Sequence, residues 1–307
     1  MYESFYGLQE RPFDLSPNPR FLCFTPQHRE ALAHLEYGLT GRPGITVLVG
    51  DAGTGKTTLV RKALQGSNRE ATVVHLLNPT LTRAEFYEYL AHGFGFSSEA
   101  GRSKIQFLRE LEENLDDEAK PRLALVVDEA QSVPYELLEE IRLLTNAESK
   151  GGRSIAVALV GQPELARRLD EVRLRQLKQR VVLRCSLTPL SLKETAAYIA
   201  GRVKTAGGEA TRLFTRDAVI AIHQHSRGIP RVISVICDNA LVNGFAADQQ
   251  PVGASIISEV CRSLALPAGE PRADSAAPPS ARVAPMAPAA AAAPMFANVG
   301  RRRFSFF

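Results

Sequence analysis

Apolar residues along the chain form two patterns, short continuous runs and helical spacing, and these patterns alternate. The continuous runs predict buried strands at 44–50, 71–77, 122–130, 154–161 and 181–187. Between them, apolar residues three and four positions apart predict amphipathic helices at 26–41, 55–66, 82–96, 103–118, 135–147 and 164–180. Strands that alternate with helices indicate an α/β fold, with a parallel five-stranded sheet covered by helices on both faces.

The pattern changes after Pro189. Helical spacing dominates from there and predicts helices at 190–207, 215–228, 229–247 and 253–265, which together indicate a small all-helical domain. From 267 to 300 the chain is rich in Pro and Ala without periodicity, so we expect a disordered linker, followed by the peptide RRRFSFF at 301–307. The predicted domains are therefore 1–188 (α/β, with an N-terminal lead-in), 189–266 (helical), 267–300 and 301–307.

The turn after the first strand carries a phosphate-binding signature. Gly50 to Thr57, GDAGTGKT, fits the P-loop pattern G-x-x-x-x-G-K-[ST] between a predicted strand and a predicted helix. Glycines let consecutive backbone N–H groups turn toward a phosphate, and the start of the helix adds its positive dipole end. The predicted cofactor-binding residues are Gly50, Asp51, Ala52, Gly53, Thr54, Gly55, Lys56, Thr57 and Thr58. Lys56 would reach the β- and γ-phosphates, and the Thr57 hydroxyl would bind Mg²⁺.

A pair of carboxylates ends the third predicted strand, in LALVVDEAQ. We expect Asp128 to hold Mg²⁺ through water and Glu129 to polarise the attacking water as general base. A second acid at this place favours a hydrolase over a simple nucleotide switch. Gln162 follows the fourth strand. Its side chain either senses the γ-phosphate or helps to orient the water; the other interpretation is that it simply begins the next helix.

Two groups of arginines are candidates for stabilising the charge that develops during phosphoryl transfer. In RLRQLKQR, Arg180 is the first candidate for a finger that reaches a neighbouring subunit and Arg175 is the second; a solvated basic helix face is the alternative. Arg231, in RGIPRV at a predicted helix start, would reach the γ-phosphate of its own subunit. A cation in a first helical turn is opposed by the helix dipole, which favours a functional role for Arg231.

Charge and hydropathy narrow the class of protein. The net charge of the chain is +4. Residues 267–307 carry five arginines and two acids, a net charge of +3, so the rest of the chain is close to neutral. A near-neutral body gives no global electrostatic case for nucleic-acid binding. Residues 1–20 lack the apolar core of a leader, and no long apolar run predicts a transmembrane helix. We therefore expect a cytoplasmic protein.

With these motifs, residues 1–265 resemble the AAA+ ATPases of the general secretion pathway protein A family. The resemblance rests on the segments YESFYGLQERPFDLSPNPRFL, HREALAHLEYGL, GDAGTGKTTL, LVVDEAQ, LVGQPEL, LRQLKQR and GIPRVI. It implies an AAA+ P-loop NTPase fold in which the helical domain is a lid, ATP and Mg²⁺ as cofactors, ATP hydrolysis, and homo-oligomers that form a ring or a filament. It also implies that the segment from Phe13 to Phe21 lies near the nucleotide base.

The resemblance implies a role in assembling or energising a bacterial secretion, pilus or exopolysaccharide export system. Its alternative is a DNA-binding ATP switch, because transposition regulators belong to the same ATPase class. Three arginines and three phenylalanines at 301–307 would let the chain dock on a partner or peripherally on the inner membrane; an inert tail is the other interpretation.

Overall fold

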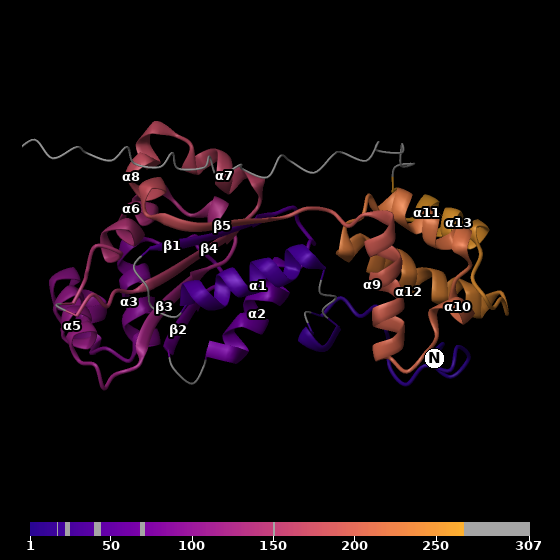
Figure 1. Ribbon diagram of the computed structural model, residues 1–307, viewed down its shortest axis with the longest axis horizontal. Helices are drawn as coiled ribbons and strands as arrows, with labels where there is room; N and C mark the ends of the chain where they lie inside the picture. The colour runs from indigo at the N-terminus through magenta and orange to yellow at the C-terminus, as the bar shows by residue number, and fades with distance from the viewer. Residues whose placement is uncertain (17, 22–24, 40–43, 68–70, 150, 267–307) are drawn as a thin grey trace, which may run out of the picture. The chain divides into compact units, whose positions relative to one another are not determined.

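The computed structural model describes residues 1–16, 18–21, 25–39, 44–67, 71–149 and 151–266 (Figure 1). The predicted linker at 267–300 and the peptide at 301–307 lie outside the described residues. Among the described residues, no helix has the combination of length and hydropathy needed to cross a membrane.

A five-stranded parallel sheet forms the first domain, as predicted. The strands are β1 (Ile45–Gly50), β2 (Ala71–Leu76), β3 (Arg122–Val127), β4 (Ala156–Gly161) and β5 (Val181–Leu187). Their order in the sheet is β2-β3-β4-β1-β5. Every residue of β1 and of β4 is buried, which is why the two strands read as continuous apolar runs in the sequence.

Helices cover both faces of this sheet (Figure 1). They are α1 (Pro26–Leu39), α2 (Lys56–Ser67), α3 (Arg83–Phe94), α4 (Ser98–Arg102), α5 (Lys104–Asp116), α6 (Tyr135–Leu144), α7 (Pro163–Leu169) and α8 (Arg175–Gln179). Successive strand residues enter different cores. Val47 packs in one cluster with Phe86 of α3 and Phe107 of α5, whereas Leu48 packs in another with Leu35 of α1 and Leu59 of α2.

The predicted helix at 164–180 is instead three pieces: α7, the 3₁₀ turn η3 (Val172–Leu174) and α8. In a continuous helix, Val172 would follow Leu169 on the buried face. Val172 is 86% exposed, and Leu174 and Leu177 are buried in its place. The break shifts the helical register so that both leucines reach the core. A short 3₁₀ turn, η2 (Ala130–Ser132), also belongs to this part, whereas η1 (Pro19–Phe21) lies in the N-terminal lead-in.

The second domain is all-helical, as predicted. It contains α9 (Leu192–Thr205), α10 (Ala210–Leu213), α11 (Arg216–Ser226), α12 (Pro230–Ala246) and α13 (Ala254–Ser263). The short helix α10 was not predicted. The core of this domain is one cluster that includes Ile199, Ile222, Ile236 and Ile257.

The N-terminal lead-in, residues 1–21, packs its apolar side chains into this helical core. Our sequence analysis grouped the lead-in with the α/β domain, but Tyr6 and Phe13 are buried in the cluster formed by α9 to α13. The Arg202 guanidinium of α9 holds the segment, donating to the backbone oxygens of Pro12 and Asp14. The N-terminal segment of the chain therefore forms part of the core of the helical domain.

We expect Phe13→Ala to destabilise the protein by about 3–5 kcal/mol, because it empties a fully buried site. Leu15→Ala is the matched control in the same segment: Leu15 is 52% exposed, and its loss should cost within about 0.5 kcal/mol. Urea unfolding of both variants measures the difference. Equal stabilities would contradict the packing of the lead-in described here.

Candidate active site

The site lies where strands β1, β3 and β4 end. The loop between Gly50, the last residue of β1, and Lys56, the first of α2, is the predicted P-loop. Gly53 and Gly55 have φ angles of +82° and +98°, a backbone region that residues with a side chain rarely adopt. A Cβ atom on Gly53 would also lie 2.7 Å from the Cβ of Arg231. Glycine is thus required at position 53 for both its conformation and its space.

Lys56 is 5% exposed, and its ammonium donates hydrogen bonds to the backbone oxygens of Gly50 and Asp51, at 2.8 and 3.0 Å. Burial lowers the pKa of Lys56, and the carboxylates of Glu129, Asp128 and Asp51 oppose that shift. The ammonium therefore lies inside the loop and is attracted by three carboxylates.

Asp128 follows the last residue of β3 and is 4% exposed. The Thr57 hydroxyl donates to its Oδ2 at 2.9 Å, and the backbone N–H of Glu129 donates to its Oδ1 at 2.9 Å. Among the described residues there is no group of three or more His, Cys, Asp or Glu side chains that could hold a metal ion. One hydroxyl and one carboxylate fit Mg²⁺, which prefers oxygen ligands and completes its shell with water and phosphate.

Glu129 adopts the left-handed conformation, with φ of +49°. Its Oε2 accepts hydrogen bonds from the Gln131 side-chain amide at 2.6 Å and from the Gln162 side-chain amide at 3.2 Å. The bond from Gln131 lowers the pKa of the Glu129 carboxyl; partial burial opposes this, and Gln162 and Lys56 add to it. Glu129 is therefore held as a carboxylate that faces the loop lysine.

The contacts of Gln162 bear on the two interpretations that the sequence left open. Gln162 is the N-cap residue of α7, yet its side chain makes no capping hydrogen bond. It donates to Glu129 instead, so the structure brings Gln162 into the site.

Arg231 also reaches the P-loop. It lies in the first turn of α12, and its backbone N–H donates to the Gly53 oxygen at 3.2 Å. Its Cδ would lie 3.5 Å from a Cβ placed on Gly53, so the side chain runs along the loop. The start of a helix in the second domain thus contacts the loop of the first.

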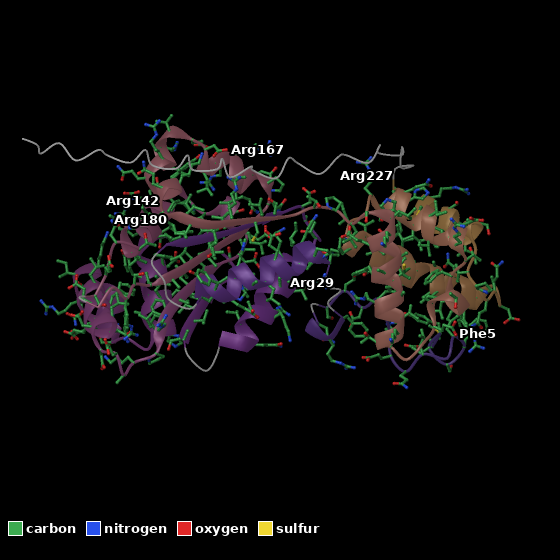
Figure 2. The ribbon with its side chains drawn as sticks, viewed as in Figure 1. Phe5, Arg29, Arg142, Arg167, Arg180 and Arg227 are labelled. Atoms are coloured by element: carbon green, nitrogen blue, oxygen red, sulfur yellow. The ribbon has the colours of Figure 1, made fainter. Side chains whose placement is uncertain are left out.

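Arg180, labelled in Figure 2, lies at the other end of β1 from this group. Its backbone oxygen accepts from the N–H of Ile45, the first residue of β1, whereas the P-loop follows the last residue. Its guanidinium donates to the Asn146 side chain at 2.6 Å. The six residues of β1 separate Arg180 from the loop, a length of roughly 20 Å. Arg180 therefore cannot serve the site of its own chain.

Sequence reasoning missed two residues of the site, His28 and Gln131. His28 is 5% exposed, and its Nε2 lies 3.2 Å from the backbone oxygen of Thr54 in the P-loop. Its Nδ1 lies 2.6 Å from the Thr25 hydroxyl. Because a carbonyl can only accept, Nε2 carries the proton and Nδ1 accepts. Neither residue stands out in the sequence, since a lone His in a helix and a Gln after a strand are ordinary.

Comparison with known proteins agrees with this geometry. The family model described as an AAA domain matches residues 39–169. General secretion pathway protein A of Aeromonas hydrophila is 42% identical over 250 residues, which is 80% of this chain and 45% of that protein. The chain therefore contains an AAA domain, and most of its length is similar to general secretion pathway protein A. This confirms the resemblance found in the sequence, although the chain spans less than half the length of that relative.

Solved structures resemble the AAA+ fold at low sequence identity. The ORC2 protein of Aeropyrum pernix, in ADPNP–ADP complexes, has a TM-score of 0.62 at 17% identity, covering 83% of this chain and 71% of that one. CDC6P of Pyrobaculum aerophilum has a TM-score of 0.60 at 18% identity, covering 82% and 70%. At this identity they show the fold alone, a P-loop NTPase domain with further helices.

His28 makes the stability of the AAA+ fold depend on pH. Burial lowers the pKa of His28 below the usual value of 6.5. The unfolded chain therefore binds a proton first as the pH falls, and the free energy of unfolding should drop below about pH 6.5 and be fully present above it. We expect His28→Gln, which keeps a donor for Thr54, to flatten this dependence.

Urea unfolding of both proteins between pH 5 and 8 measures the effect. Some dependence should survive in His28→Gln, because burial also lowers the pKa of His75. Identical slopes in the two proteins would contradict the role given to His28.

Proposed function

We propose that the chain binds ATP with Mg²⁺ and hydrolyses it to ADP and phosphate. The observation that carries the proposal is the convergence of four side chains from two elements. Lys56 and Thr57 come from the start of α2, and Asp128 and Glu129 come from the end of β3. A lysine, a hydroxyl and two carboxylates at the ends of parallel strands are the groups that phosphoryl transfer requires.

The P-loop would hold the phosphates. The backbone N–H groups of residues 50–58 and the positive end of α2 favour negative charge, and Lys56 would exchange its bonds to loop carbonyls for bonds to the β- and γ-phosphates. Thr57 and Asp128 would hold Mg²⁺, which when bound neutralises charge on the phosphate oxygens.

Glu129 would act as the general base. Its carboxylate is ionised, lies near Lys56, and is oriented by Gln162, so it can accept a proton from a water aligned with the γ-phosphate. Arg231 would approach the same phosphate from α12 and link the position of the helical lid to the nucleotide. Arg180 would complete the site of a neighbouring subunit, which makes oligomerisation part of catalysis.

The cellular role proposed for this ATPase follows from its relative. General secretion pathway protein A carries a secretion role in its name and shares 42% identity over 250 residues. We propose that this chain assembles or energises a secretion, pilus or exopolysaccharide export machine through nucleotide-dependent oligomers. It would work in the cytoplasm, with the peptide at 301–307, outside the described residues, as its attachment to the inner membrane.

Two substitutions separate binding from hydrolysis. Glu129→Gln should keep ATP binding and lower kcat by about 10²- to 10⁴-fold, because it removes the base and keeps the shape. Lys56→Ala should weaken ATP binding, since it removes the charge that faces the phosphates. Lys62→Ala, further along α2, is the control and should retain both properties. ATP titration and phosphate release measure them, and full hydrolysis by Glu129→Gln would reject the assignment.

A mixing experiment tests Arg180. Arg180→Ala should lower kcat by about 10³-fold or more if it completes a neighbour's site. Adding the Glu129→Gln protein should restore part of the activity. In a mixed oligomer its subunits supply Arg180 to the sites of neighbouring Arg180→Ala subunits, which still have Glu129. Arg167→Ala, at an exposed residue on α7 (Figure 2), is the control and should leave hydrolysis unchanged. If Arg180→Ala mixed with Glu129→Gln regains no activity, whereas Arg175→Ala mixed with Glu129→Gln does, then Arg175 is the arginine finger.

A further inference from the structure

Gln131 connects the end of β3 to the end of β4 through its side chain. Its Nε2 donates to Oε2 of Glu129 at 2.6 Å, and its Oε1 accepts from the backbone N–H of Gln162 at 3.0 Å. A carboxylate can only accept and a backbone N–H can only donate, so the contacts leave a single orientation for this amide. Both ends of the side chain are therefore used.

The neighbouring residues leave room for this link. A Cβ atom on Gly161, the last residue of β4, would lie 2.7 Å from Oε1 of Gln131. No strained backbone angle requires glycine at this position. Glycine leaves space for the Gln131 amide and, less tightly, for Leu165, whose Cδ2 and Cβ would lie 3.1 and 3.2 Å from that Cβ. Arg168 of α7 separately holds the backbone of this turn, donating to the carbonyl oxygens of Gln131 and Val133.

We propose that Gln131 is a positioning residue for hydrolysis, which fixes the Glu129 carboxylate relative to β4 so that its Oε1 accepts the proton of the attacking water. The inference rests on the proposed ATPase function. Among the described residues, both hydrogen bonds to the Glu129 carboxylate end on Oε2, and the bond from Gln131 is the shorter by 0.6 Å. Gln162 alone would hold the Glu129 carboxylate more loosely.

The backbone of Glu129 explains why an orienting group is needed. A non-glycine residue in the left-handed conformation is strained, and such residues persist where their surroundings hold them. Arg168 fixes the turn after Glu129 from outside, but no bond from Arg168 reaches the carboxylate itself. Orientation of that carboxylate comes from the two glutamine amides.

Gln131→Ala should therefore lower kcat by roughly 10- to 100-fold, because a misplaced base loses its alignment with the water. The dissociation constant for ATP should stay unchanged, measured by the nucleotide-dependent rise in melting temperature. Gln131→Glu keeps an acceptor for the Gln162 N–H but replaces the donor to Glu129 by a carboxylate, so its kcat should fall at least as far. Gln106→Ala, which removes an amide bonded to Glu110 on α5, is the control.

A double-substitution cycle with Gly161 distinguishes positioning from general damage. Gly161→Ala pushes the Gln131 amide aside without removing it, and its closest contact is with that amide rather than with Leu165, so its kcat should fall like that of Gln131→Ala. The double variant should be no slower than either single one, because the same link is already lost. Additive losses, a raised KM with unchanged kcat, or wild-type kcat in Gln131→Ala would each overturn the proposal.

The outcome for Glu129→Gln separates this inference from the proposed function. If Glu129→Gln is inactive and Gln131→Ala is normal, only the role of Gln131 fails. If Glu129→Gln hydrolyses ATP at the full rate, the base itself is misassigned and the positioning role fails with it.

Discussion

The hydrogen bond between the Thr57 hydroxyl and Asp128 joins the two halves of the site, and it depends on the order of the strands. In β3-β4-β1, the loop after β1 and the acids after β3 lie on either side of β4 and meet at the carboxyl edge of the sheet. Lys56 and Asp128 are both almost fully buried there. Buried charges are costly unless they are paired or hydrogen-bonded. Loop carbonyls accept from Lys56, the Thr57 hydroxyl and the N–H of Glu129 donate to Asp128, and the attraction between the two opposite charges adds to these bonds.

The elements that the sequence predicts well are those whose signal is local. The strand predicted at 181–187 coincides with β5, and the helix predicted at 82–96 is α3, with its Thr82 capping box and an end at Gly95 in the left-handed conformation. The lead-in has no periodicity, and its position depends on contacts far along the chain, such as Phe13 with Phe214. The break after Leu169 was missed because the charged residues that follow fit a helical pattern equally well in a continuous helix and in one that is interrupted by a turn.

The same distinction applies to the site. The P-loop and the acid pair are contiguous motifs, so their place at strand ends follows from the sequence. Gln131 acts through the backbone of Gln162, 31 residues away, and through the left-handed conformation of Glu129. His28 acts through a carbonyl of the P-loop. No pattern of residue types along the chain encodes these contacts, because they arise from the adjacency of β3 and β4 and from the packing of α1 beside α2.

The P-loop carbonyls show how the two domains can act together. The Asp51 oxygen accepts from Lys56 and from the Thr54 hydroxyl, the Thr54 oxygen from His28, and the Gly53 oxygen from the N–H of Arg231. Donors outside the loop hold two successive carbonyls, one from α1 beside the sheet and one from α12 of the helical domain. The bond between Arg231 and Gly53 therefore connects the helical domain directly to the loop whose amides would hold a phosphate in the proposed function.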